Sequence, residues 1–268
     1  MLNGGLMKIK STILFLILLL LTTVDNSTAQ DFKEVEKTFK IDMGGEVTIE
    51  TYKGEIKIET WDKAEVHVYA KMVPDDDGGF WSTKPEKQLA HVDVELDASS
   101  NSVRIESKYR KSNSWFGSNT RAFVNYKIQM PKTTRLNIND YKSETFISGL
   151  QSTINFETYK GEVKIIDLSG SIDLETYKGE VDVRFVKING NCSFDTYKGE
   201  INISLPKSSA FSVDADFGKK TDFYSSFDID RDSYKKNRKD YNIRKDINGG
   251  GPTIRLSSDK GKIELHEK

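Results

Sequence analysis

The feature that most constrains the fold of this sequence is a heptapeptide that recurs with almost no change. The sequence Glu-Thr-Tyr-Lys-Gly-Glu-Ile at 50–56 returns at 157–163, 175–181 and 195–201, with only Asp for the first Glu or Val for the last Ile. The tyrosines of the last three copies lie 18 and 20 residues apart. Weaker copies occupy 140–144, 216–219 and 259–263. A period of this length is typical of repeat architectures, in which each unit packs on its neighbours.

Hydrophobic periodicity around each copy indicates strands. Around the copy at 175–181, Ile172 and Leu174 alternate with charged residues, and Val181 and Val183 do the same. Apolar residues at every second position are typical of strands with one buried face. No segment after residue 30 has the pattern of a long amphipathic helix. The sequence therefore predicts an all-β protein.

Two architectures fit a repeat made of two short strands. In a β-meander or sandwich, each heptapeptide would close an antiparallel hairpin. In a parallel β-solenoid, or β-helix, each repeat of 18–20 residues would form one coil, stacked about 4.8 Å from the next. We favour the solenoid, because the copies agree at exposed positions as well as at buried ones, and keep the meander as the alternative.

Each residue type in the heptapeptide has its own expected role. A glycine can adopt the positive φ that a tight turn needs. The predicted structural turn residues are Gly54, Gly161, Gly179 and Gly199. We expect the threonines to point inward and the tyrosines and lysines outward. The single cysteine, Cys192, is expected to be a small buried residue stacked on Ile172.

Residues 30–136 interrupt the repeat. Longer alternating stretches predict long antiparallel strands at 66–73, 91–96, 103–109 and 122–130. These strands form either a sheet-like N-terminal section or a large excursion from the first coil. The repeat section is expected at 137–268, with a polar, charged loop inserted at 219–248.

The first 29 residues have the order of a secretory signal peptide. Lys8 and Lys10 precede an apolar run at 13–21, and small residues follow at Ser27 and Ala29. The apolar run is short for a membrane span, which needs about 20 residues. We therefore expect cleavage after Ala29 and export to the periplasm or the cell surface, with a retained N-terminal anchor as the alternative. The remaining chain is expected to hold no transmembrane segment.

The composition excludes several classes of partner. The formal charge of −1 lacks the basic excess typical of nucleic-acid binding. One cysteine cannot form an internal disulfide. The stability of the exported chain must therefore come from packing and backbone hydrogen bonds.

A family resemblance follows from these motifs. The chain carries a predicted signal peptide, the strand repeats, and the closing segment Gly-Gly-Gly-Pro-Thr-Ile-Arg-Leu at 249–256 with Lys-Gly-Lys-Ile-Glu at 260–264. Together these features resemble the "putative adhesin" family of exported bacterial β-repeat proteins, of the Bacteroidetes type. The resemblance covers about 40–268 and implies right-handed parallel β-helices of uncharacterised function. Family members often carry Ser-Gly-Asp where this chain has Lys-Gly-Glu, so any role of that Ser or Asp does not carry over.

Catalytic and metal-binding patterns are absent from the sequence. His67, His91 and His266 fall in separate predicted strands, and no zinc, phosphate-loop or nucleophile motif occurs. The acidic runs at 75–77 and 228–232 lack a full set of calcium ligands, so we expect solvated loops. We expect no enzyme activity, no cofactor and no metal.

The remaining candidates are binding surfaces. The outward ladder would present aromatic and cationic groups at regular spacing, and tryptophans in loops can stack on sugars. The candidate binding residues are Tyr159, Lys160, Tyr177, Lys178, Tyr197, Lys198, Trp81 and Trp115. We expect a non-catalytic envelope protein that binds or scaffolds through its repeated surface, with a glycan or another envelope protein as partner. The alternatives are a purely structural spacer and, less favoured, a polysaccharide-active enzyme.

Overall fold

The computed structural model describes residues 32–76, 83–110, 121–229 and 240–268, all within the unit Asp31–Lys268. The predicted signal peptide and the candidates Trp81 and Trp115 lie outside the described residues. The strands are β1 (Lys33–Lys40), β2 (Glu46–Glu50), β3 (Lys53–Trp61), β4 (Glu65–Val73), β5 (Val92–Ala98), β6 (Ser102–Tyr109), β7 (Phe123–Pro131), β8 (Arg135–Asp140), β9 (Lys142–Ser148), β10 (Thr153–Ile188), β11 (Cys192–Leu205), β12 (Phe211–Ser225), β13 (Asp240–Ile247) and β14 (Thr253–Glu267). One short helix, α1 (Pro85–Ala90), accompanies them in the described chain. The prediction of an all-β protein is confirmed.

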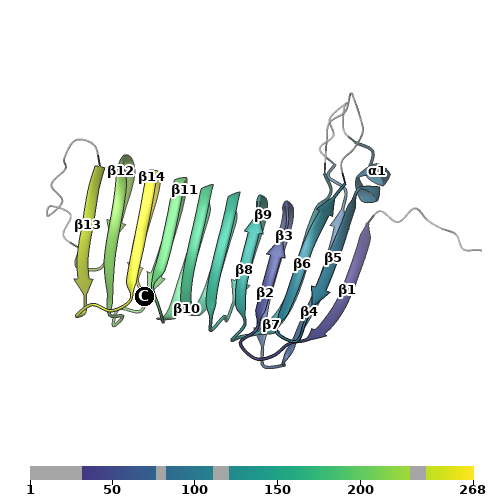
Figure 1. Cartoon of the computed structure of the whole chain (residues 1–268). Helices are drawn as coiled ribbons and strands as arrows, with labels where there is room; N and C mark the ends of the chain where they lie inside the picture. Colours follow the sequence, from purple (N-terminus) through teal and green to yellow (C-terminus); the bar gives the residue numbers. More distant parts are fainter. Residues whose placement is uncertain (1–31, 77–82, 111–120, 230–239) are drawn as a thin grey trace, which may run out of the picture. The chain divides into compact units, whose positions relative to one another are not determined.

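The strands of the repeat region lie side by side in a single row (Figure 1). The order along the main path is β1-β4-β7-β3-β9-β10-β11-β14-β12-β13, while β5, β6, β2 and β8 continue a second path that also meets β10. The chain thus has two faces, which share β10, β11, β14 and β12. We call each stacked level that contributes a strand to both faces a rung.

Neighbouring rungs pair in parallel and with equivalent residues in register. Asp173 of β10 lies opposite Ser193 of β11, and Val181 lies opposite Ile201. β11 continues in the same way, with Ile201 opposite Ile263 of β14. Antiparallel hairpins at the heptapeptides, which the meander requires, are not formed by these pairs.

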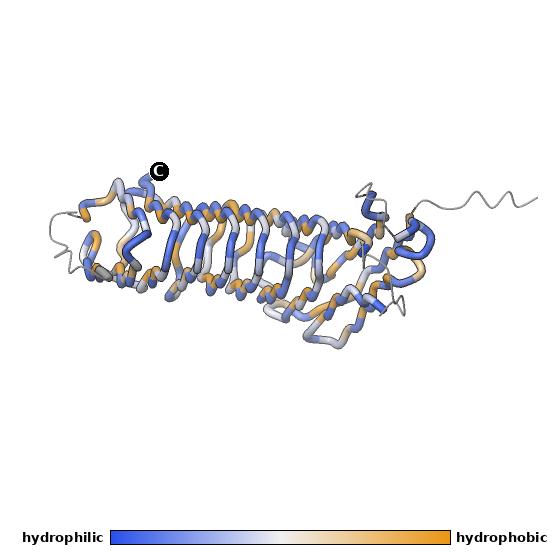
Figure 2. The backbone as a smooth tube through the Cα atoms, turned by 90° about the horizontal axis from the view of Figure 1, so that it is seen from above, coloured by the Kyte–Doolittle hydropathy of each residue, from blue (hydrophilic) through white to orange (hydrophobic). Residues whose placement is uncertain are grey.

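Alternating burial places the core between the two faces. Leu174, Phe194 and Leu256 are fully buried on one face, and Val183 and Ile203 on the other. Figure 2 shows successive passes of the chain lying beside one another, with hydrophilic and hydrophobic residues alternating along them. The predicted period-two pattern is therefore the pattern of the core. The described part of the chain has no helix of the length and apolarity that crossing a bilayer would require.

The N-terminal strands form an excursion from the first rung. β2 and β3 pair in parallel with β8 and β9, so the heptapeptide at 50–56 lies beside the weaker copy at 140–144. Between them the chain adds the antiparallel pairs β1–β4, β4–β7 and β5–β6. β6 and β7 also pair in parallel with β2 and β3. The predicted antiparallel strands are present, and parallel pairing joins them to the stack.

The order of rungs differs from the order of repeats in the sequence. β14 pairs in parallel with β11 on one side and with β12 on the other. The weak copy at 259–263 therefore lies next to the copy at 195–201, although the weak copy at 216–219 comes between these two in the sequence.

The prediction of a loop over 219–248 is wrong at both ends of that segment. β12 continues to Ser225, and β13 pairs antiparallel with the first half of β12, with Phe211 opposite Ile247. Ile243 and Ile247 are buried against the core, which explains why this polar segment forms a strand. The short helix α1 was also not predicted.

Candidate functional site

The heptapeptides align at the corner where the two faces of each rung meet. Thr158, Thr176 and Thr196 point inward and are almost fully buried, as predicted. Tyr159 and Tyr177 are both 44% exposed, so tyrosine points outward as predicted. The backbone remains in strand conformation through the corner, and β10 passes through two of the copies without interruption.

Glycine is needed at this corner for a reason other than the predicted one. Positive φ is present at Gly54 but not at Gly161, Gly179 or Gly199, so that prediction is wrong for the last three. A Cβ at Gly179 would lie 2.3 Å from the carbonyl oxygen of Gly161, and one at Gly199 would lie 2.6 Å from that of Gly179. The glycines allow one rung to approach the next closely.

The tyrosines form a continuous stack, which we call the tyrosine ladder. Its members are Tyr52, Tyr141, Tyr159, Tyr177 and Tyr197. Successive ring centroids lie 4.8–4.9 Å apart and the ring planes are within 10° of parallel. Stacked aromatic pairs of this kind contribute about 0.5–1.5 kcal/mol each beyond burial.

A cation lies at each end of the tyrosine ladder. The guanidinium of Arg121 lies 4.1 Å from the ring centroid of Tyr52. Lys260 Nζ lies 5.1 Å from the ring centroid of Tyr197 and donates to its hydroxyl at 3.3 Å. Each cation is attracted to the π-electrons of the neighbouring tyrosine ring, which is a cation–π interaction. Sequence spacing could not place Lys260 there, because the contact depends on β14 lying beside β11.

This stacking changes what the ladder can bind. The rings cover one another's faces, so the inner rings offer mainly their edges and hydroxyl groups to a ligand. Stacking of a sugar ring on each tyrosine face, the interaction that makes aromatic ladders attractive for glycans, is blocked by the neighbouring tyrosine. The ladder therefore supports the corner and borders any site formed there.

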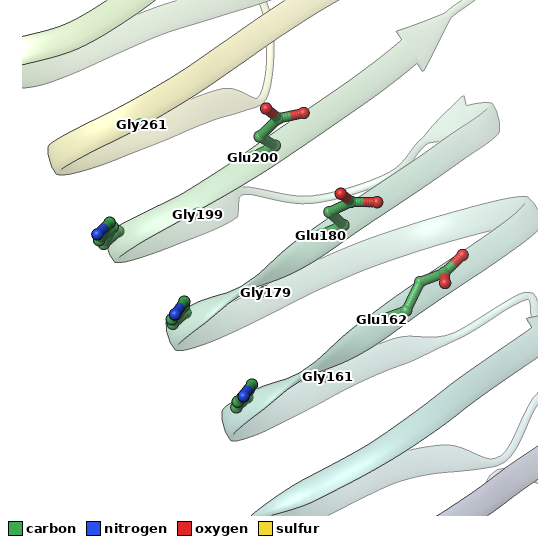
Figure 3. A pocket seen from close by; sticks show the side chains of 10 residues that line it. Gly161, Glu162, Gly179, Glu180, Gly199, Glu200 and Gly261 are labelled. Carbon is green, nitrogen blue, oxygen red and sulfur yellow. The ribbon is translucent and has the colours of Figure 1, made fainter.

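Beside the ladder, two rows of opposite charge run across the rungs. The lysine row is Lys142, Lys160, Lys178 and Lys198, and the glutamate row is Glu144, Glu162, Glu180 and Glu200. All of these side chains are exposed. The positions between the rows are Ser143, Gly161, Gly179 and Gly199. Figure 3 shows the glutamates on successive strands beside the row of glycines.

The missing side chains of the glycines leave a shallow groove between the rows, which we call the charged groove. Its volume is about 540 Å³, and it extends over the rungs of Lys160, Lys178 and Lys198 to Gly261 of β14. Its walls are the lysine and glutamate side chains, and its floor is backbone. An extended chain could lie along it, across the rungs.

Most members of the two charged rows lie in register with a residue of like charge, whereas Glu200 lies in register with Lys262 of β14 and interacts with it electrostatically. The ion pairs among the described residues include no member of the lysine row or the glutamate row. Like charges in adjacent rungs repel by less than about 1 kcal/mol per pair in screened water. The rows are therefore a small but repeated electrostatic cost that a ligand could relieve.

A second groove borders the other side of the tyrosine ladder. It has a volume of about 380 Å³ and is lined by ladder tyrosines together with Glu157, Glu175 and Asp195. The buried carboxyl of Asp140 also lines this groove. Burial raises the pKa of Asp140, and the hydrogen bonds that the carboxylate accepts from Ser143 offset only part of that rise.

The lysine of the first heptapeptide has a different environment. Lys53 lies in register with Lys142 but is buried, and its Nζ forms an ion pair with the equally buried Asp75. Its Nζ also lies 4.3 Å from the ring centroid of Phe123. The backbone N–H of Asp75 donates to Gln88 Oε1 at 2.8 Å, which connects the pair to α1. Lys53 therefore has a structural role.

The remaining candidates form no second site in the described chain. His67 lies in β4 and His266 in β14, whereas His91 follows α1 and is not in the predicted strand. No group of acidic, histidine or cysteine side chains among the described residues could hold a metal ion. Asp75, in the first acidic run, forms the buried ion pair with Lys53. The prediction of a solvated loop is therefore wrong for Asp75.

Cys192 is buried and unpaired, in line with its expected place in the core. Burial raises the pKa of its thiol to about 11, so the thiol is protonated at neutral pH and is a poor nucleophile.

Comparison with solved structures gives distant likenesses, among them the following three. A "putative cell adhesion protein" from Clostridium sporogenes has a TM-score of 0.44 and 11% identity, over 88% of this chain and 100% of that one. A "putative adhesin" from Bacteroides fragilis has a TM-score of 0.40 and 13% identity, over 87% and 97%. A "putative lipid binding protein" from Parabacteroides distasonis has a TM-score of 0.23 and 13% identity, over 87% and 96%.

No curated protein matches the chain. The family model described as Toastrack DUF4097 matches residues 22–266, which is most of the sequence. This match agrees with the resemblance drawn from the repeats and the closing segment. The chain therefore belongs to the Toastrack DUF4097 family.

Proposed function

We propose that this protein is a non-catalytic, exported protein of the cell envelope that binds or scaffolds an envelope component through its repeated corner. The observation that carries the proposal is the register of that corner. Successive rungs present the same tyrosine, lysine and glutamate, with the lysines and glutamates exposed. An array of this kind can hold a repetitive partner at many weak contacts at once.

We further infer that each repeat forms one coil of a β-solenoid, with 30–136 as an N-terminal section and 137–268 as the repeat section. Parallel pairing at offsets of one repeat supports this inference. The signal-peptide pattern at 1–29 supports export. Mass spectrometry of the protein recovered from outside the cytoplasm should give a mature N-terminus at Gln30. A chain that keeps residues 1–29 there would indicate the retained anchor instead of cleavage, and a chain found only in the cytoplasm would contradict the export proposal.

Co-sedimentation with fractionated cell envelope tests the binding proposal. Wild-type protein should sediment with a cell-wall, membrane or capsule fraction. A variant with Lys160→Gln, Lys178→Gln and Lys198→Gln should lose most of that binding and still melt like the wild type, because these side chains are exposed.

The matched control removes the same charge elsewhere. Lys40→Gln, Lys87→Gln and Lys187→Gln change exposed lysines outside the corner, and they should leave sedimentation unchanged. Failure of the wild type to sediment with any fraction would reject the binding role and favour a structural spacer. Equal loss in the two variants would show that net charge, and not the corner, determines binding.

A further inference from the structure

The charged groove has a spacing that selects among ligands. Each of the four rungs from Lys142 to Lys198 contributes one lysine and, two residues later, one glutamate, and adjacent rungs are separated by about 4.8 Å. The next rung, in β14, has Lys260 in register with Lys198 but Lys262 in register with Glu200. A ligand that uses the whole lysine row must present one anionic group at each interval of that length. It must also be linear, because equivalent residues of successive rungs lie in register on parallel strands; Figure 3 shows this for the glycines and glutamates.

The glutamate row narrows the choice further. Carboxylates accept hydrogen bonds but repel a polymer that is anionic on all sides. The groove therefore suits a chain that carries an anion toward the lysines and hydroxyl groups toward the glutamates. Acidic polysaccharides have both groups on each unit, and an extended sugar unit spans a distance comparable with the separation of strands.

The floor of the groove is compatible with this ligand. Gly161, Gly179 and Gly199 leave the backbone uncovered, so a sugar ring can approach it closely between the two walls. A nucleic acid fits less well, because its phosphates would meet the glutamate row and the chain has no basic excess.

We propose that the charged groove binds a linear acidic polysaccharide with a carboxylate on every unit, one unit per rung. This proposal rests on the proposed function and specifies the ligand class for the same corner. Successive units of such a chain are rotated about its axis, so the carboxylates that face the lysine row pair with its lysines, and hydroxyl groups on the opposite edge donate to the glutamates.

Calorimetry with oligogalacturonates of increasing length tests the spacing. Affinity should rise with each added unit until the oligomer spans the lysines that lie in register from Lys142 to Lys198 and on to Lys260 and Lys220, and then level off. Fully methyl-esterified oligomers of the same length, which carry no charge, should not bind. An affinity that does not depend on length would overturn the proposal.

Variants separate specific binding from general charge attraction. Lys160→Gln, Lys178→Gln and Lys198→Gln together should weaken binding by about tenfold or more, since contacts to one polymer act jointly. The control triplet at Lys40, Lys87 and Lys187 should not change the affinity.

Changing the glutamates distinguishes specific binding of the polysaccharide from general attraction of a polyanion, because the two explanations predict opposite changes in affinity. Glu162→Gln, Glu180→Gln and Glu200→Gln should weaken binding of the oligogalacturonate if the carboxylates accept its hydroxyl groups. The same variant should strengthen binding of any polyanion if the attraction is merely electrostatic. Stronger binding in this variant, or equal affinity of wild-type protein for single-stranded DNA, would overturn the proposal.

The outcome is distinguishable from failure of the proposed function. If envelope sedimentation depends on the lysine row but no oligogalacturonate binds, the ligand class is wrong and the binding role remains. If neither occurs, both fail together.

Discussion

A glycine in this protein is constrained by the rung beside it more than by its own backbone angles. Gly161, Gly179 and Gly199 have ordinary extended backbones, yet each lies where a side chain would meet a carbonyl oxygen of the preceding rung. Glycine at position 54 is required for both reasons: its φ is +141°, and an added Cβ would lie 2.1 Å from the carbonyl oxygen of Val124. Glycines at equivalent positions of the repeat are therefore required for different structural reasons.

Gly179→Ala should destabilise the fold because the added Cβ has no space. It would lie 2.3 Å from Gly161 O, and both atoms belong to stiff backbone positions. We expect a loss of roughly 2–3 kcal/mol, which lowers the Tm by roughly 5–10 °C in a chain of this size. Thermal unfolding followed by circular dichroism measures this loss.

Gly249→Ala is the matched control, since a Cβ there meets no atom within 4 Å although φ is +92°. Its loss should be near 1 kcal/mol, from backbone strain alone. Equal losses in both variants would mean that close approach is not what requires glycine at the corner.

Much of the corner could be predicted residue by residue. Period-two alternation placed the threonines inward and the tyrosines outward, because each strand has one buried face. The role of Lys53 could not be predicted, since its burial results from Phe123 and Asp75, which lie in strands or connections far away in sequence. The closeness of neighbouring rungs at the glycines is likewise a property of packing.

At the scale of elements, the buried Lys53–Asp75 pair fastens the connection after β4 to the first rung. Gln88 of α1 donates from Nε2 to the carbonyl oxygens of Asp75 and Thr83, at 3.0 and 2.8 Å. The short helix is therefore held by polar contacts as well as by burial of Leu89. Its six residues alone are too few for stable helix formation in water.

Lys53→Met should destabilise the protein strongly, because it leaves the carboxylate of Asp75 buried without its partner. The expected loss is about 3 kcal/mol, measured by chemical denaturation. Lys160→Met at the equivalent heptapeptide position should change the stability by less than about 0.5 kcal/mol, since Lys160 is exposed.

Adding Asp75→Asn to Lys53→Met should recover part of the loss, because the buried site then holds no net charge. Similar effects of Lys53→Met and Lys160→Met would show that the pair contributes little. A double variant worse than Lys53→Met alone would instead assign the main role to the hydrogen bonds of the Asp75 carboxylate.

At the scale of the whole described unit, the position of β14 is the feature that binds the repeat together. β14 fills the space between β11 and β12 and pairs in parallel with both. Without it, two strand edges would face each other unpaired, with the buried residues Ile254 and Ile263 missing from the core. Unpaired edges of this kind favour association with other chains.

A chain stopped after Pro252 should therefore lose its monodisperse state. We expect it to elute as oligomers or aggregates in size-exclusion chromatography with light scattering, and to lose its cooperative melting transition. Adding a peptide of residues 253–268 during refolding should restore a species of the original size, whereas a scrambled peptide should not. A truncated chain that stays monomeric with an unchanged Tm would contradict this view.

The all-β class and the parallel repeat could be inferred from sequence because they depend on local alternation and on a short period. The order of the rungs could not, because the sequence distance between two copies does not tell whether a later segment is inserted between them. The long-range pairing of β14 with β11 determines that order, and it also brings Lys260 to Tyr197. The strand β13 escaped prediction for the same reason, since its polar sequence is buried on one side only by packing on β12.

The inserted strand also has a consequence for biosynthesis. A ribosome delivers β11 and β12 before β14, so the nascent chain holds an open slot until the later segment emerges. A messenger cut short before that segment would yield a product that displays the unfilled slot to proteases and chaperones. The insertion thus makes the completed stack itself a sign that translation passed through β14.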